Sequence, residues 1–430
     1  MHKTALVTFI GAVACASTLS RSTSNEEIID QGDQPVRIAL ATAASSATLG
    51  GTGTWRIYSR TTTDMVARGN ANETMRVEAR GGQLIVIKPD GSVTSRRAAP
   101  FRVRTASPES FVTYGGKKYR GEIIITPGDG ALLVVNRLGV ESYLRGVVPL
   151  EIGGRKAGEE AAVEAQAVAA RSYAYAHMAD AGNRAFDMYG SVQDQDYGGV
   201  NAETPMSDAA VASTHNVVLR YAGKVISAPY HSTCGGSTAA VNEVWWRQPD
   251  QPYLRPVSDK IPGTDSSYYC DISGRFRWTT TFEGDQLKTA LEKYLGSVTQ
   301  ASEPPVSPNP SAARLSLGRI TGFRVEGRTA SNRVAAVSVQ TDRGNYVVRG
   351  NDVRFVLRTP SGSLLNSTYF TADATPDANG EITHLVLHGG GYGHGIGMCQ
   401  FGAIGRARAG QDYKTILTTY YPGTTVGPID

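Results

Sequence analysis

The residues best suited to chemistry lie in a glycine-rich stretch near the end of the chain. Six glycines fall between Gly389 and Gly397, and His394 and Gln400 stand within or just beyond this stretch. Glycine loses much conformational entropy on folding, so a folded protein keeps it where the backbone takes positive φ or approaches another group closely. The stretch lacks the Gly-Lys-Ser/Thr ending of a phosphate-binding loop, so nucleotide binding is not expected. We expect a loop that brings the backbone and a few polar groups against a ligand; a tight structural turn is the alternative.

Glu151 is the best candidate for an acid catalyst. It follows the apolar run 146–150, which resembles a strand, and stands just before a turn at Gly153 and Gly154. A carboxyl group among apolar side chains is partly desolvated, and desolvation raises its pKa toward the value that a general acid needs near neutral pH. The alternative is a solvated loop glutamate.

Other polar side chains are candidates for binding a ligand. Arg171 could hold an anionic group through two hydrogen bonds, or form a salt bridge to a buried acid. Tyr197, next to amide side chains, suits a sugar ring, or belongs to an ordinary turn. His231 and Ser232 are neighbours that face opposite ways on an extended chain, so they are no base–nucleophile pair. The expected substrate-binding residues are Gln166, Arg171, Gln195, Tyr197, His231, Ser232, His394 and Gln400.

Three cysteines follow the N-terminal region, at Cys234, Cys270 and Cys399. In an oxidising compartment two of them would tend to pair, and we expect a disulfide between Cys234 and Cys270. Zinc bound by His231, Cys234 and Cys270 and free thiols remain alternatives. Because no Cys-x-x-Cys pair occurs and four ligands cannot be assembled, no metal or other cofactor is expected.

The N-terminus predicts export. Residues 1–14 have the charged start, the short apolar run and the Ala-x-Ala ending of a signal peptide. Cys15 follows, so a lipoprotein is the alternative to ordinary secretion, and residues 15–34 read as a disordered leader. We expect an exported protein, periplasmic or associated with the cell envelope. The net charge of +4 over 430 residues, without a basic run, gives no support for nucleic-acid binding.

The hydrophobic pattern predicts an α+β, β-rich mixed fold with one long central helix and a glycine-rich C-terminal loop. Short β-branched runs separated by Gly, Pro and Asp fill residues 35–140. An alanine-rich helix is expected at 159–180. The other expected elements are a helix at 204–216 capped by Thr204, a hairpin at 217–230, an amphipathic helix at 283–295, an exposed linker at 302–310 and strands at 315–370.

Six motifs in order give the chain its resemblance to a known family. They are Tyr143 to Ile152, the helical Glu164 to Ala174, Gln193 to Gly199, Tyr230 to Gly236, the glycine-rich loop, and Tyr420 to Thr424. Together they resemble the SpoIID/LytB family of bacterial cell-wall proteins over about residues 36–428. The resemblance implies a SpoIID-like catalytic region at 141–430, with an insertion near 281–380.

The resemblance implies a peptidoglycan lytic transglycosylase, which cuts glycan strands between N-acetylmuramic acid and N-acetylglucosamine during sporulation-like or division-related wall remodelling. Glu151 matches the family's catalytic acid. Leu150 and Ile152 depart from the usual neighbours of that glutamate, which leaves the acid in place and changes the local turn. The alternative that the resemblance implies is a non-catalytic wall-binding protein that enhances an amidase. The expected partners are peptidoglycan glycan strands and, in the second case, an amidase.

Overall fold

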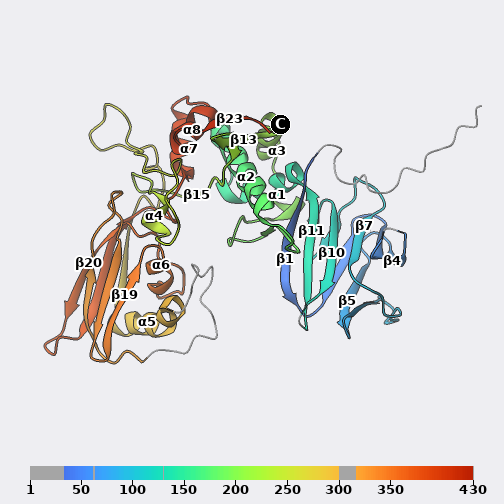
Figure 1. Cartoon of the computed structure of the whole chain (residues 1–430), viewed down its shortest axis with the longest axis horizontal. Helices are drawn as coiled ribbons and strands as arrows, with labels where there is room; N and C mark the ends of the chain where they lie inside the picture. Colours follow the sequence, from blue (N-terminus) through green and yellow to red (C-terminus); the bar gives the residue numbers. More distant parts are fainter. Residues whose placement is uncertain (1–32, 62, 129, 300–315, 430) are drawn as a thin grey trace, which may run out of the picture.

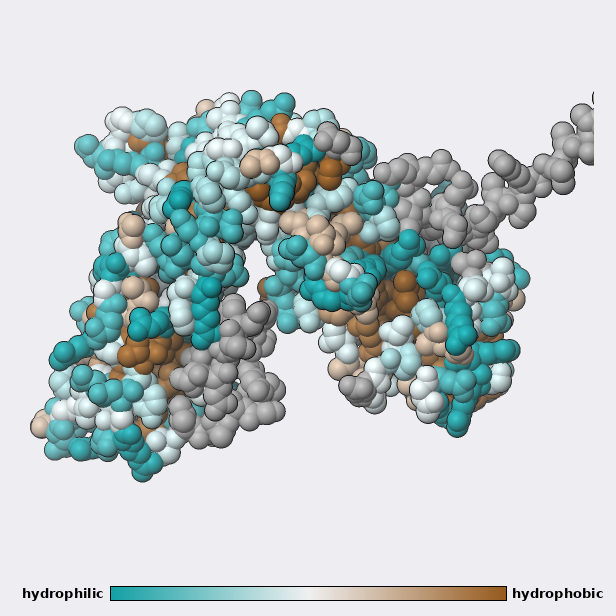
Figure 2. Space-filling view, in the orientation of Figure 1, coloured by the Kyte–Doolittle hydropathy of each residue, from teal (hydrophilic) through white to brown (hydrophobic). Residues whose placement is uncertain are grey.

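The computed structural model of the chain describes residues 33–61, 63–128, 130–299 and 316–429. Two strand-rich parts flank a helical part, so the expected α+β, β-rich class is confirmed (Figure 1). Figure 2 shows a wide notch between the two strand-rich parts, bounded on one side by the helical part. The expected signal peptide, nearly all of the leader and the linker 302–310 lie outside the described residues. Among the described helices, none has the length and apolar character needed to cross a membrane.

The N-terminal strand-rich part confirms the strands expected at 35–140. Its side chains, such as Trp55, Ile57 and Phe101, are fully buried in the main hydrophobic core. One sheet has the order β12 (Met188–Tyr189), β1 (Pro35–Ala44), β11 (Leu132–Gly139), β10 (Glu122–Pro127), β7 (Phe101–Thr105), β3 (Trp55–Ser59), β4 (Met65–Gly69). A second has the order β6 (Gln83–Ile87), β5 (Thr74–Arg80), β2 (Ala47–Gly51), β8 (Val112–Tyr114), β9 (Lys117–Tyr119).

The helical part is organised around α2 (Glu160–Asp180), the long alanine-rich helix that the sequence predicts. Small buried residues such as Ala162, Ala165 and Ala169 let its neighbours pack closely. Those neighbours are α1 (Val140–Ile152), α3 (Pro205–Ser213), α7 (Gln400–Arg408) and α8 (Tyr413–Tyr420). The Thr204 side chain accepts a hydrogen bond from the backbone N–H of Ser207, so the predicted cap of α3 is confirmed.

Short strands connect the helical part to the C-terminal segments. The expected hairpin forms from β13 (Val217–Tyr221) and β14 (Lys224–Val225), and β23 (Thr425–Pro428) extends it. More important for the site, β15 (Tyr230–His231) runs parallel to β22 (Met398–Cys399). The short helix η1 (Gly199–Ala202) precedes β13 in the chain, and the short helix α4 (Val241–Val244) follows β15.

The second strand-rich part has a hydrophobic core of its own. The predicted amphipathic helix is α5 (Gly284–Thr299), which buries Leu287, Leu291 and Leu295 in that core. The core extends from Phe282 to Leu387, close to the insertion expected near 281–380, whose bounds as a domain stay a prediction. The remaining elements are β16 (Arg277–Glu283), β17 (Ile320–Val325), β18 (Ala336–Thr341), β19 (Gly344–Arg349), α6 (Asp352–Val356), β20 (Phe370–Pro376) and β21 (Ile382–Gly390).

Candidate active site

Glu151 lies in the last turn of α1, so the strand expected before it is wrong. The helix forms because its apolar residues recur at helical spacing and face the core, which outweighs the strand preference of two adjacent valines. It ends at Gly153, whose φ of 74° is open to glycine and closed to most other residues. The buried residues of α1 are Val140, Tyr143, Leu144, Gly146, Val147, Val148 and Ile152.

The surroundings of Glu151 favour a protonated carboxyl group. Burial raises its pKa from 4.5 to about 7. Two hydrogen bonds oppose that rise without cancelling it: the backbone N–H of Asp196 donates to Oε1 at 2.9 Å, and the Tyr230 hydroxyl bonds to the same carboxylate. A carboxyl group with a pKa near 7 is partly protonated at neutral pH, which a general acid requires.

A chain of hydrogen bonds fixes the position of the Tyr230 hydroxyl. Gln195 Nε2 donates to it at 3.0 Å, and Gln195 Oε1 accepts from the hydroxyl of Tyr143 at 3.0 Å. Gln195 is fully buried, so it cannot reach a substrate as expected from the sequence. Instead it links the core tyrosine of α1 to the tyrosine that contacts Glu151.

The glycine-rich loop reaches this network through His394. The Nε2 atom of His394 donates to the backbone oxygen of Tyr230 at 2.8 Å, and its Nδ1 accepts from the backbone N–H of Ile396 at 3.1 Å. Burial lowers the pKa of His394 to about 3, so the ring is neutral near pH 7 and keeps both roles. His394 therefore holds the strand that carries Tyr230 in place, in addition to any contact with a ligand.

An aromatic groove opens beside the network. It has a volume of about 1130 Å³ and is lined by the second half of α2, the β13–β14 hairpin and residues 241–254. Tyr173 lies in its wall, close enough to Glu151 that the charge of the carboxylate helps burial to raise the pKa of the tyrosine hydroxyl. Trp245 lines the groove as well, with its ring centroid 5.2 Å from that of His394. Aromatic faces with nearby polar groups suit sugar rings.

Two expected binding residues of α2 have internal partners instead. Arg171 is fully buried, and its Nε and Nη2 atoms donate to the two carboxylate oxygens of Glu141 at 2.7 and 2.6 Å. This is the salt bridge that the sequence left open, and it is inaccessible to a ligand. Gln166 Oε1 accepts from Gln400 Nε2 at 3.2 Å, and both side chains are buried. These three residues lie in the interior, where they make the contacts above, and their expected role in binding a substrate stays a prediction.

The remaining expected residues also pack inside. Tyr197 is buried, and its hydroxyl donates to Asn136 Oδ1 at 2.9 Å, so its ring is not available for stacking on a sugar. His231 is buried, with Nδ1 3.1 Å from the backbone oxygen of Ile396. Ser232 is half-buried on the same segment. The residue that does face Glu151 is Tyr230, which sequence reasoning missed.

The alternation of side chains along a strand could have indicated that Tyr230 faces Glu151. Successive side chains on a strand face opposite ways, so Tyr230 and His231 cannot both face the same site. His231 drew attention as a histidine, yet the side chain that faces the acid is its neighbour. Tyr173 was missed for a different reason, because a tyrosine on an alanine-rich helix gives no sign of the groove beside it.

The three cysteines are free thiols in place of the expected disulfide, with Cys234 Sγ 3.5 Å from Cys270 Sγ. They form a buried cluster with Asp259 that could hold a metal ion, made of Cys234, Asp259, Cys270 and Cys399. His231, the expected third zinc ligand, is not part of this cluster. The cluster instead contains Asp259 and Cys399, which the sequence did not suggest as ligands.

Two family descriptions match parts of the chain. Residues 128–221 match the family described as stage II sporulation protein (SpoIID), and this range contains Glu151. Residues 264–397 match a domain of unknown function, which includes the second strand-rich part.

Three relatives match most of the chain. An uncharacterized protein of Brachyspira hyodysenteriae is 30% identical over 73% of this chain and 73% of its own length. The amidase enhancer of Bacillus subtilis is 31% identical over 66% of this chain, a match that spans only 40% of the enhancer. Stage II sporulation protein D of Bacillus subtilis is 28% identical over 69% of this chain and 76% of its own length.

Proposed function

Because this chain belongs to the stage II sporulation protein D (SpoIID) family, we propose that it is an exported peptidoglycan lytic transglycosylase. In this proposal it cleaves glycan strands between N-acetylmuramic acid and N-acetylglucosamine in the cell envelope. The observation that supports the proposal most is the state of Glu151, whose pKa is raised to about 7 by burial. The aromatic groove, whose wall includes Tyr173 near Glu151, offers a surface on which sugar rings of the glycan strand can stack.

The proposed reaction needs one acid. Glu151 donates its proton to the glycosidic oxygen, and the bond from that oxygen to the anomeric carbon breaks. The 6-hydroxyl oxygen of the same muramic acid residue then bonds to the anomeric carbon, and its proton returns to the Glu151 carboxylate. No water is consumed, and the product carries a 1,6-anhydro ring. Tyr230 and the Asp196 backbone N–H keep the carboxylate oriented between the two proton transfers.

Asp196 is the carboxylate that a hydrolytic mechanism would use. It lies near Glu151, where its charge contributes to the raised pKa of that group. An ordinary glycosidase needs a second carboxylate as base or nucleophile, whereas the proposed lyase does not. Under the proposal, Asp196→Asn retains cleavage and still yields anhydro ends.

The decisive experiment is mass analysis of products from purified peptidoglycan, with and without stem peptides. Anhydro ends, each lighter by one water than a reducing end, support the lyase. Reducing ends from the wild type would overturn it in favour of a hydrolase. Glu151→Gln is the matched control, because it preserves the shape of the side chain and cannot donate the proton.

A wall-binding role is the second candidate, because one relative is named an amidase enhancer. In that role the chain would bind glycan strands and stimulate a cell-wall amidase without cutting glycan. Amidase digestion of peptidoglycan, with wild type or Glu151→Gln added, separates the two. Equal stimulation by both proteins, with no glycan products from either, would support the enhancer.

A further inference from the structure

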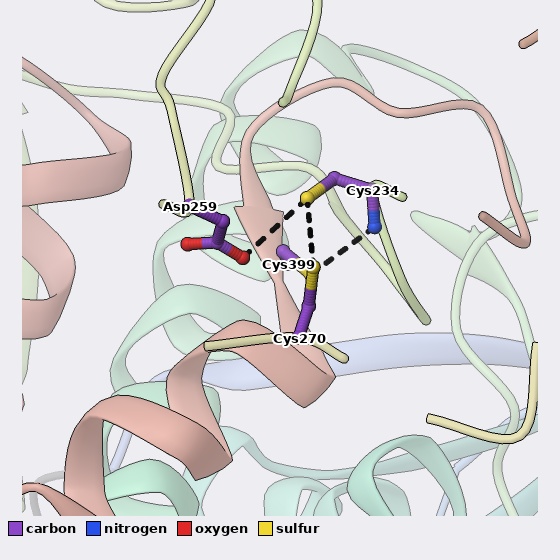
Figure 3. A group of neighbouring side chains, drawn as sticks. All are labelled: Cys234, Asp259, Cys270 and Cys399. Atoms are coloured by element: carbon purple, nitrogen blue, oxygen red, sulfur yellow. Dashed lines mark hydrogen bonds between the residues drawn. The ribbon is translucent and has the colours of Figure 1, made fainter. Parts of the chain in front are cut away.

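Four side chains converge at a buried point where the C-terminal loop meets β15 (Figure 3). Cys234 follows β15, Cys399 ends β22, and Asp259 and Cys270 come from the long connection between α4 and β16. Their ligand atoms all lie within 4.8 Å of one another, and all four residues are buried. We propose that this cluster is a structural zinc site with three thiolate ligands and one carboxylate ligand.

The distances suit a tetrahedral ion and do not suit a disulfide. Cys234 Sγ lies 3.5 Å from Cys270 Sγ and 3.4 Å from Asp259 Oδ2. A tetrahedral zinc ion places two sulfurs about 3.8 Å apart, and a sulfur and a carboxylate oxygen about 3.5 Å apart. A disulfide would bring the sulfurs to about 2.05 Å. These two distances are thus close to those that a zinc ion would impose, and all four ligand atoms lie within 4.8 Å of one another.

Backbone N–H groups support two of the sulfurs as thiolates. Cys399 Sγ accepts from the N–H of Cys234 at 3.2 Å and from the N–H of Gly402 at 3.3 Å. Cys399 is also the residue that caps the N-terminus of α7, where the helix dipole favours negative charge. Cys234 Sγ accepts from the N–H of Gly236 at 3.4 Å, in a turn where the Gly236 φ of 123° requires glycine. Hydrogen bonds of this kind stabilise the negative charge of a thiolate, the form of cysteine that binds a metal.

Hydrogen bonds on the side away from the thiols orient the Asp259 carboxylate. Oδ1 of Asp259 accepts from the Tyr420 hydroxyl at 2.6 Å and from Arg406 Nη2 at 3.1 Å, which leaves Oδ2 facing the thiols. Such outer hydrogen bonds are typical of the carboxylate ligands of metals. Gly402 belongs to the same arrangement, because a side chain there would collide with Asp259 and Tyr420.

Charge supports the same assignment. Three thiolates and one carboxylate around a divalent ion leave two negative charges, which a buried site must neutralise. Two buried arginines stand beside it: Arg406 on Asp259, and Arg333, whose Nη2 donates to the backbone oxygen of Cys234 at 3.1 Å. Because soft thiolates favour zinc and four protein ligands leave no open position, the site is structural and takes no part in the cleavage reaction.

The site ties together segments that meet at the active site. Cys234 lies four residues after Tyr230, and β15 pairs with the strand that ends at Cys399. A zinc ion would therefore hold in place the strand whose tyrosine contacts Glu151.

The test is the metal content of the purified full chain, prepared without chelators. We expect about one zinc ion per chain, and X-ray absorption at the zinc edge should show three sulfur neighbours at about 2.3 Å and one lighter neighbour. Cys270→Ser and Asp259→Asn should each lower the zinc content of the folded chain severalfold. Asp265→Asn is the matched control, because Asp265 is an exposed acid on the same connection and is not one of the four ligands, so zinc should stay unchanged.

Two outcomes would overturn the proposal. The first is wild-type protein without zinc in which Cys234 and Cys270 resist thiol labelling under denaturing, non-reducing conditions, which indicates a disulfide. The second is zinc-free protein in which all three thiols label. A variant that fails to fold would make its zinc content uninformative, so a second measurement uses the wild type only. Wild-type protein loaded with cobalt in place of zinc should show the strong sulfur-to-cobalt absorption of a thiolate site, and its absence would contradict the proposal. None of these readouts depends on glycan cleavage, so their failure leaves the lytic proposal untouched.

Discussion

Replacing Glu151 by glutamine should remove the activity and, above neutral pH, stabilise the fold. Burial raises the pKa of this carboxyl group from 4.5 to about 7. Between these values the group ionises in the unfolded chain while it stays protonated in the folded one. One pKa unit corresponds to about 1.4 kcal/mol, so Glu151 lowers the free energy of unfolding by about 3 kcal/mol above pH 7 and by almost nothing below pH 4. Glutamine cannot ionise, so this loss disappears.

The measurement is urea unfolding of the wild type and Glu151→Gln at several pH values between about 4 and 8. The stability of Glu151→Gln relative to the wild type should rise with pH by about 3 kcal/mol over this range. If glutamine cannot make the hydrogen bond to Tyr230, the variant loses a constant amount of unfolding free energy at every pH. The test is therefore how the difference in unfolding free energy between the two proteins changes with pH, and not its absolute value. If the two curves run parallel, Glu151 is not the buried acid described above, and the proposed mechanism loses its basis.

Glu109→Gln is the matched control, since Glu109 is an exposed glutamate in the N-terminal part. Its stability should follow that of the wild type across the same pH range. Turnover of glycan by Glu151→Gln should fall by about 100-fold or more, as loss of a general acid predicts. A stable Glu151→Gln protein with near-normal turnover would remove this residue from the mechanism.

Three other substitutions test the surrounding network. Tyr230→Phe removes a hydrogen bond that lowers the pKa of Glu151, so the alkaline loss of activity should move to higher pH, and a move to lower pH would contradict the network. His394→Ala removes the side chain that donates to the backbone oxygen of Tyr230, so we expect a loss of about 1–3 kcal/mol in unfolding free energy together with lower turnover. A drop in glycan affinity without a loss of stability would show instead that His394 binds the glycan directly. Arg171→Lys keeps the positive charge but cannot reproduce the two-point contact with Glu141, so it should destabilise the fold by about 1–3 kcal/mol. The specific activity of the folded fraction should stay unchanged in a glycan-cleavage assay.

Local signals in the sequence predicted most of the secondary structure. The alanine-rich pattern predicted α2, Thr204 predicted the start of α3, and leucines at four-residue steps predicted α5. These predictions succeeded because each signal depends only on residues that are neighbours along the chain. The segment before Glu151 was predicted wrongly. Its valines and proline resemble a strand, yet the helix buries an apolar face that only the fold can supply.

The candidate site was harder to predict than the fold, because burial decides what a polar side chain can do. Arg171 and Tyr197 are types that bind sugars and anions, but their partners Glu141 and Asn136 lie far away in the sequence and became visible only in the structure. The thiol cluster shows the same limit. Cys234 and Cys270 were expected as a disulfide and are free thiols 3.5 Å apart, while Asp259 carries no local sign that it lies beside them.

The glycine-rich loop explains why so many distant residues bear on one acid. Gly391 has a φ of 84°, and a side chain there would lie 2.7 Å from the backbone oxygen of Thr233, so the loop packs directly on the segment that begins at Tyr230. His394 then bonds to the backbone of Tyr230, and the thiol cluster holds the same segment at Cys234. Tyr230 is thus fixed at both ends of its segment, and its hydroxyl can keep one position against Glu151. Under the proposed mechanism, the conformational entropy that the loop glycines cost is offset by the fixed position of the hydroxyl that contacts the acid.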